Sequence, residues 1–291
     1  MLIVTGATGA LGAQIVDQLL TRVPAEEVGV SVRDPAKADA LRARGVRVRH
    51  GDFADPASLA AAFAGARRVL LASAATTGDT AQTLHRAAVT AARDAGAERI
   101  LYTSHQAASP ASVFAPMPDH AATERGLAAS GTAWTALRNG FYASSALLFL
   151  GQALETGELV APEDGPVSWT AHADLAEAAA LALTSDDPAF DGATPPLTGP
   201  EALDLSALAA IASELTGREI TRTTVADADF HATLVARGVP DERATLLVGM
   251  FEASRAGEFA TVDPTLERLL GRPPTPVRDT LARAVAQPTR A

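Results

Sequence analysis

The first twelve residues, MLIVTGATGALG (1–12), decide the fold. An apolar run enters a turn that carries Gly6, Gly9 and Gly12, and the amphipathic stretch AQIVDQLL (13–20) follows. A bound pyrophosphate needs backbone N–H groups that point at it and a helix N-terminus behind it. Gly6 permits the tight turn, Gly9 permits close approach of phosphates, and Gly12 lets the helix pack on the strand. We therefore expect a nucleotide-binding turn; the alternative is a plain strand-to-helix turn.

Composition excludes several classes of protein. The 291 residues carry a net charge of -10, whereas a nucleic acid or an anionic membrane needs a basic surface. The absence of cysteine excludes disulfides and thiolate metal sites, and the histidines show no metal-ligand spacing. No stretch reaches the roughly 18 apolar residues of a membrane span, and the N-terminus lacks a signal-peptide pattern. We expect a cytoplasmic protein with no metal, nucleic-acid or membrane partner.

Short apolar runs alternate with helical stretches through the first half of the chain. Strands are predicted at 2–6, 28–33, 46–53, 68–73, 99–104 and 133–140, and helices at 13–20, 34–45, 55–65, 81–96 and 119–130. Asp34 and Asp55 each precede a proline, which is typical of a helix N-cap. Strands that alternate with helices form parallel sheets covered on both faces. The expected fold class is α/β, a Rossmann-like doubly wound parallel sheet.

The residue at the end of the second strand distinguishes NADPH from NADH. An NAD site usually places Asp or Glu there to accept from the ribose 2′-hydroxyl, whereas this strand ends in Arg33. A guanidinium pairs with a 2′-phosphate through two parallel hydrogen bonds, and Lys37 adds charge one helical turn later. Asp34 could take the 2′-hydroxyl instead, but we interpret it as the helix cap. NADP(H) is the expected cofactor; the alternative for Arg33 is a solvated charge.

Two further loops face the expected nucleotide. Asp52 and Phe53 close the third strand and are placed to flank an adenine, Asp52 by hydrogen bonding and Phe53 by its ring or backbone. The alternative is a turn Asp followed by a core Phe. Ser73 ends the fourth strand among small residues, where it could contact the nicotinamide ribose or cap the next segment.

The regular alternation ends after Phe141, and helical stretches separated by proline clusters follow. We predict an NAD(P)-binding Rossmann domain over 1–145 and a smaller, mostly helical substrate-binding lobe over 146–291. Residues of about 160–200 are expected to return to the sheet. The lobe is expected at the carboxyl ends of the strands, where ligands of open parallel sheets bind.

The sequence lacks the usual proton relay of short-chain reductases, a Tyr activated by a Lys four residues later. Tyr102 is followed at that distance by Gln106 and Tyr142 by Ala146, and the one lysine in the chain is Lys37. Reduction of a simple ketone builds an alkoxide, which needs a strong local acid. A quinone or another conjugated acceptor delocalises the incoming charge. We therefore expect hydride transfer to a conjugated acceptor.

The acceptor is expected where the fifth and sixth strands end. His105, His120 and Tyr142 are the candidate catalytic residues, because an imidazole can orient an acceptor oxygen or protonate it near neutral pH. The Tyr142 hydroxyl is expected to position the substrate. Phe141, Tyr142 and Trp169 are the expected substrate contacts, since an aromatic rim suits a flat ring. Each histidine alone is also typical of a polar loop residue, and Trp169 of a core residue.

Several motifs occur in the order found in one known family. They are TGATGALG (5–12), VRDPAKADAL (32–41), GDFADPASL (51–59), ILYTS (100–104), ATERGLAASG (122–131), TALRNGFY (135–142), ADLAEAAALAL (173–183) and LERLLGRPPTPV (266–277). Through them almost the whole chain resembles the NmrA-like atypical short-chain dehydrogenase/reductases. It is most similar to the branch of bacterial NAD(P)H:quinone oxidoreductase type 2 and triphenylmethane reductase.

The resemblance implies NADPH use and a site between the two domains. The cofactor contacts that it implies are Gly6, Thr8, Gly9, Leu11, Arg33, Asp52 and Ser73, with Asn139 and Tyr142 at the nicotinamide end. The neighbouring Ala10, Gly12, Lys37 and Phe53 complete the predicted set. One departure is Arg125, where relatives often have Lys. Arginine gives up its proton far less readily, which puts a lysine-assisted proton step in doubt.

Two other functions fit the same fold. The family also contains non-catalytic members that bind the dinucleotide and report redox state to a regulator. A tailoring reductase of secondary metabolism would use another acceptor. A sensor needs no cavity beside the nicotinamide, whereas a reductase must have one. The expected partner is a small conjugated acceptor such as a quinone, and a homodimer is left open.

Overall fold

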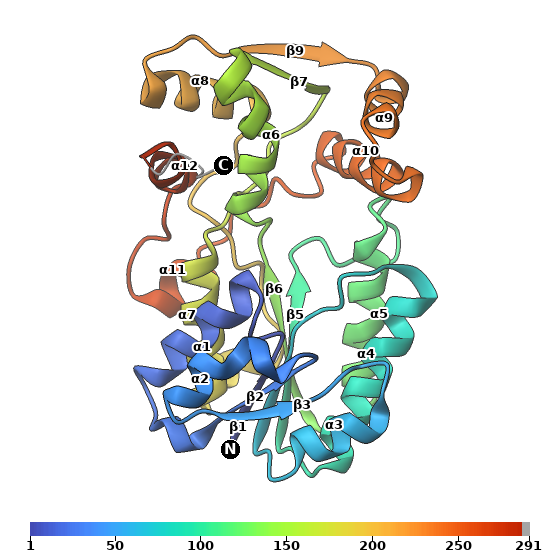
Figure 1. The fold of residues 1–291 in the computed structure, drawn as a ribbon, viewed down its shortest axis with the longest axis vertical. Helices are drawn as coiled ribbons and strands as arrows, with labels where there is room; N and C mark the ends of the chain where they lie inside the picture. Colours follow the sequence, from blue (N-terminus) through green and yellow to red (C-terminus); the bar gives the residue numbers. More distant parts are fainter. Residues whose placement is uncertain (287–291) are drawn as a thin grey trace.

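A seven-stranded parallel sheet forms the centre of the computed structural model, which describes residues 1–286 (Figure 1). Its strand order is β3-β2-β1-β4-β5-β6-β8, and every neighbouring pair is parallel. The strands are β1 (Leu2–Thr5), β2 (Val28–Val32), β3 (Arg47–His50), β4 (Arg68–Leu71), β5 (Arg99–His105), β6 (Ala133–Asn139) and β8 (Gly192–Ala193). The predicted doubly wound α/β fold is confirmed.

Helices cover both faces of this sheet (Figure 1). On one face α7 packs against α1 and α11, and on the other face α3 and α5 pack against α4. These helices are α1 (Ala10–Leu20), α2 (Asp39–Ala43), α3 (Pro56–Phe63), α4 (Gly78–Asp94), α5 (Pro116–Ala128), α7 (His172–Thr184) and α11 (Thr265–Leu270). The crossover helices therefore bury both faces of the parallel strands, as such a sheet requires.

A second group of elements lies above the carboxyl ends of the strands in Figure 1. It has its own apolar core, and the parallel pair β7 and β9 forms a separate small sheet. The members are α6 (Ala143–Thr156), β7 (Glu158–Pro162), α8 (Leu205–Thr216), β9 (Thr221–Val225), α9 (Asp227–Ala236), α10 (Asp241–Arg255) and α12 (Val277–Ala286). Between β7 and α8 in the sequence, α7 packs on α1 at the large sheet and β8 pairs with β6. The domain boundary after residue 145 stays a prediction.

Local turn chemistry shortens two of the predicted elements. The helix expected over 34–45 is a 3₁₀ turn followed by the short α2, and the Asp34 carboxylate caps the turn by accepting from the N–H of Ala36 at 3.1 Å. The strand expected over 46–53 ends with β3, because Asp52 turns the chain back. β8 is not predicted at all, since a two-residue strand leaves no pattern. No helix of residues 1–286 is long and apolar enough to cross a membrane.

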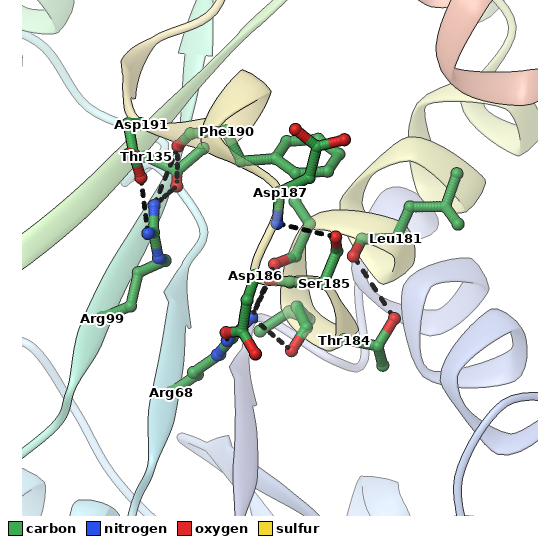
Figure 2. Close-up of polar contacts among 12 residues, drawn as sticks. Arg68, Arg99, Thr135, Leu181, Thr184, Ser185, Asp186, Asp187, Phe190 and Asp191 are labelled. Carbon is green, nitrogen blue, oxygen red and sulfur yellow. Dashed lines mark hydrogen bonds and ion pairs between the residues drawn. The ribbon is translucent and has the colours of Figure 1, made fainter.

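A buried arginine anchors the end of α7 to the amino end of β4 (Figure 2). The side chain of Arg68 is only 3% exposed. Its guanidinium donates to the carbonyls of Ala182 and Leu183 at 3.2 and 3.3 Å, and it pairs with Asp186. The last carbonyls of a helix have no partner within the helix. Arg68 therefore caps α7 and ties it to the sheet in one contact.

Arg99 repeats this arrangement one strand further along the sheet (Figure 2). Its guanidinium donates to the Phe190 carbonyl at 3.0 Å and to the Asp191 carboxylate at 2.6 Å. The nitrogen that donates to Phe190 also lies 3.1 Å from the hydroxyl of Thr135 on β6. The segment that leads into β8 is thus held beside β6 by a charged group at the start of β5.

The glycine turn between β1 and α1 leaves no room for side chains. Gly6 has a φ of +63°, in the left-handed region that favours glycine. A Cβ atom added to Gly12 would lie 2.2 Å from the carbonyl oxygen of Gly6, which is too close for any contact between these atoms. The first turn of α1 therefore packs directly on the backbone of the turn.

We expect Gly12→Ala to lower the free energy of unfolding by about 1–3 kcal/mol, because the new methyl group forces the helix away from the turn. Gly126→Ala is the matched control: Gly126 lies within α5, and an added Cβ meets nothing within 4 Å. That substitution should stabilise the protein by roughly 0.5–1 kcal/mol. Denaturant unfolding followed by circular dichroism measures both changes. Equal effects of the two substitutions would contradict the close-packing argument.

Candidate functional site

The start of α1 offers unpaired backbone donors at the carboxyl end of β1. Gly9 is the N-cap residue, and no side chain caps the helix. Thr8, Gly9 and Ala10 are exposed and Leu11 is half-buried, so this side of the turn is open. The helix dipole adds partial positive charge at the same place. The turn therefore fits the pyrophosphate of a dinucleotide, which would take the place of the missing cap.

The end of β2 carries the two cations predicted to bind a 2′-phosphate. Arg33 and Lys37 are both exposed, and the Lys37 ammonium lies 4.0 Å from the Asp34 carboxylate. Asp34 accepts a hydrogen bond from the N–H of Ala36, which agrees with its interpretation as a cap. Lys37 and Thr8 also line a hollow of about 460 Å³ beside the glycine turn. A phosphate bound there would face Lys37 directly.

Asp52 and Phe53 both take part in the local structure after β3. One carboxylate oxygen of Asp52 accepts from the N–H of Ala54 at 3.0 Å. Phe53 is half-buried against the core formed by α3, α4 and β5. These contacts agree with the alternative of a turn Asp and a core Phe, and contact with an adenine stays a prediction for both residues.

The loop after β4, where a nicotinamide ribose is expected, is fixed through its backbone. Ser73 does not cap α4, whose N-cap residue is Thr77. Three consecutive N–H groups donate to side chains of other elements: Ala72 to Thr5 at 2.8 Å, Ser73 to Thr103 at 2.9 Å, and Ala74 to His85 at 2.9 Å. Such a loop can receive a ligand without paying much ordering entropy.

His85 is a structural residue that the sequence does not connect with this loop. Its Nε2 accepts from Ala74, so its proton lies on Nδ1, which is 2.9 Å from the Thr123 hydroxyl. Burial lowers the pKa of His85 to about 4, against the opposing charge of Asp119. The imidazole is therefore neutral at physiological pH, as its acceptor role requires.

His105 and Asn139 lie opposite each other at the carboxyl ends of β5 and β6. Asn139 is 2% exposed, and its side-chain oxygen has no hydrogen-bond partner within residues 1–286. Buried polar atoms are nearly always paired, so this oxygen is available to accept a hydrogen bond from a ligand. The centroids of the His105 and His120 rings are 6.2 Å apart, and Nδ1 of His120 lies 2.8 Å from the Tyr102 hydroxyl. The predicted histidines are thus brought together.

Burial determines the protonation state of the two histidines. Burial lowers the pKa of His105 and of His120 to about 3, and each has a neighbouring histidine that lowers it further. Both rings are therefore neutral near pH 7. A neutral imidazole can orient an acceptor oxygen, and protonation of the acceptor by either ring stays a prediction.

The aromatic residues after β6 divide between a surface of the site and the core. The Tyr142 ring lies 4.4 Å from that of His172, and burial raises the pKa of its phenol, with Asn139 acting in the opposite direction. Phe141 is half-buried with its ring against His105, at 5.5 Å. Trp169 is 3% exposed and donates its indole N–H to Leu203 at 2.9 Å. Trp169 is thus a core residue behind Phe141, which agrees with the alternative, and its contact with a substrate stays a prediction.

A buried ion pair beside the histidines is missing from the sequence-based prediction. Glu124 is 7% exposed and accepts from Ser104 at 2.6 Å and from Arg138 at 3.0 and 2.6 Å. Ser104 and Arg138 are paired in register on β5 and β6. The sequence contains one signal for Glu124. It follows His120 by four residues, which places both side chains on the same face of a helix. Arg125 points elsewhere and is exposed.

A cavity of about 330 Å³ opens where β5 ends. Its lining consists of Gln106, small side chains of the following loop, Ser112 and Glu258. The N–H of Gln106 donates to the carbonyl of Asn139 at 2.9 Å, so the cavity adjoins the strand ends that carry the histidine and the unpaired amide. Its volume is within the range of small-molecule sites.

Comparisons with known proteins agree with this geometry. A family model described as NAD(P)H-binding matches residues 6–186. Quinone oxidoreductase 2 of Escherichia coli (strain K12) is 37% identical over 289 residues, which are 98% of this chain and 98% of that protein.

Two solved structures resemble the whole chain. The Escherichia coli NADPH-dependent quinone oxidoreductase complexed with NADPH has a TM-score of 0.92 and 35% identity, covering 98% of this chain and all of that one. The Citrobacter sp. triphenylmethane reductase complexed with NADP(H) has a TM-score of 0.89 and 33% identity, with the same coverage. The chain therefore belongs to the NAD(P)H-binding family that its family model describes, and NAD(P)H is its cofactor.

Proposed function

We propose that the protein is an NADPH-dependent oxidoreductase that transfers a hydride to a quinone or a similar conjugated acceptor. The observation that carries this proposal is the meeting of three features at one sheet edge. They are the uncapped α1, the unpaired side-chain oxygen of Asn139, and the cavity beside Gln106. The similarity to proteins named as a quinone oxidoreductase and a triphenylmethane reductase supports it.

The proposed cofactor contacts follow the strand ends in order. Gly6, Thr8, Gly9, Ala10, Leu11 and Gly12 hold the pyrophosphate, Arg33 and Lys37 the 2′-phosphate, Asp52 and Phe53 the adenine, and Ser73 and Asn139 the nicotinamide end. When bound, NADPH supplies the hydride. The buried oxygen of Asn139 accepts from the carboxamide of the nicotinamide, which pairs an otherwise unsatisfied atom.

The side chains of the site orient the acceptor and offer it no strong acid. His105 and His120 are neutral, and Tyr142 has a raised pKa and no lysine four residues later. These groups hold an acceptor oxygen beside the ring of Phe141. One hydride and one proton convert a quinone to a hydroquinone, and water supplies the proton. A conjugated acceptor suits this site because it spreads the charge that the hydride brings.

A reductase needs space for a second ligand and a redox sensor does not, and we take the cavity beside Gln106 as part of that space. A tailoring reductase of secondary metabolism differs from this proposal only in the acceptor. A cytoplasmic location and a homodimer stay predictions.

Arg33→Ala should reduce the preference for NADPH over NADH by roughly tenfold to a hundredfold, because a guanidinium–phosphate pair contributes about 1.5–3 kcal/mol. Titration of both cofactors by fluorescence measures the preference. Arg86→Ala is the control, because Arg86 is an exposed cation of α4 and its loss changes the net charge equally. An unchanged preference for NADPH in Arg33→Ala would contradict the assignment of Arg33 to the 2′-phosphate.

Tyr142→Phe should lower acceptor turnover by less than about tenfold, because its hydroxyl positions the acceptor and donates no essential proton. Steady-state oxidation of NADPH with a quinone measures the change. A loss of several orders of magnitude with intact cofactor binding would reveal a proton relay through Tyr142.

Turnover should be nearly independent of pH between about 5.5 and 8.5. A lowered pKa favours the neutral imidazole, so His105 and His120 gain a proton only near pH 3, far below this range. The measurement is kcat against pH at saturating NADPH and quinone. An acid limb near pH 6.5 that disappears in His120→Gln would show that His120 titrates during catalysis.

A further inference from the structure

The cavity beside Gln106 has one acidic wall. Glu258 lines it and accepts a hydrogen bond from the Ser112 hydroxyl on the opposite loop. Glu258 follows α10, whereas Gln106 follows β5, so the cavity lies between the sheet edge and the elements above it. A molecule that occupies this cavity meets the carboxylate.

The charge of Glu258 is not cancelled by the basic residue nearest to it in the sequence. The guanidinium of Arg255 forms two hydrogen bonds with the Asp227 carboxylate, at 3.1 and 2.7 Å, and one with the Glu163 carbonyl at 2.6 Å. The hydrogen-bond donor to Glu258 is the neutral Ser112. The carboxylate therefore presents negative charge to the cavity.

The residue after Glu258 belongs to a cluster of aromatic rings that does not line the cavity. Phe259, the residue after Glu258, is buried and lies 5.1 Å from the ring of Phe141 and 5.8 Å from that of Phe114. His105 lies 5.7 Å from Phe259 and is neutral. The other residues that line the cavity around Glu258 are Gln106 and small side chains of the loop after β5. No cation among these neighbours offsets Glu258.

From this arrangement we infer that Glu258 makes the acceptor site select by charge. Acceptors that are neutral or cationic at the outward end are preferred, and acceptors that carry a sulfonate or carboxylate there are rejected. The inference rests on the proposed function, because it takes the cavity as the outer part of the acceptor site. It adds the charge class of the acceptor.

The test compares a naphthoquinone with its sulfonate in the native protein, in Glu258→Gln and in Glu252→Gln. Glutamine keeps the size of the side chain and can still accept from Ser112. Glu252 is an exposed residue of α10 outside the cavity lining, so Glu252→Gln changes the net charge equally. The quantity is the ratio of kcat/KM for the sulfonate to that for the neutral quinone. Differences in redox potential cancel when the same ratio is compared between proteins.

We expect Glu258→Gln to raise this ratio about threefold to thirtyfold, within the range of one charge–charge contact near a protein surface. The rise should shrink in high salt, because salt screens the charge. Glu252→Gln should leave the ratio at the native value. An unchanged ratio in Glu258→Gln, or the same rise in both variants, overturns the inference.

Equilibrium binding of both quinones to the NADP⁺-loaded proteins separates the inference from the proposed function, because no turnover occurs there. If neither quinone supports NADPH oxidation but Glu258→Gln still shifts the ratio of Kd values toward the sulfonate, the proposed function fails and the charge selection holds. If the Kd ratio does not shift, or neither quinone binds, the charge selection fails.

Discussion

The direct contact between the backbone of the glycine turn and the first turn of α1 is the constraint on which the site depends. Because Gly12 has no Cβ, α1 begins close to the carbonyl of Gly6, and its free N–H groups face the carboxyl ends of the strands. A dinucleotide that binds these groups must extend along the same edge. The positions of the loops after β2, β4, β5 and β6 then decide what each part of it meets.

Polar groups at or below the surface of the core hold those loops in place. His85 accepts from the loop after β4, and the pair of Glu124 and Arg138 joins β6 to α5. Removing one partner of a buried ion pair leaves an uncompensated charge, so Glu124 and Arg138 constrain each other. The ends of β5 and β6 thus present an amide and uncharged rings, whereas the carboxylate of Glu258 lies in the cavity beyond Gln106.

The periodicity of apolar residues and the turn residues were sufficient to predict most elements in the first half of the chain. The alternation of apolar runs predicts six of the seven strands of the large sheet, and Asp34 and Asp55 cap as their following prolines indicate. The contacts of Arg68 join residues more than a hundred positions apart, and β8 pairs Gly192 with the distant Thr135 of β6, so no local pattern contains either. For the site, the strand ends were predictable from topology. The lowered pKa values were not, because burial is a property of the packed structure.

The anchors at Arg68 and Arg99 also bear on how the chain assembles. The strand at one edge of the large sheet, β8, and the helix that covers α1, α7, come from residues 172–193, well after the last long strand. During synthesis the face of α1 stays exposed to water until this segment has emerged. Strand pairing of the large sheet is therefore completed late, and a fragment that stops after α6 would present an open edge and an apolar helix face to other chains.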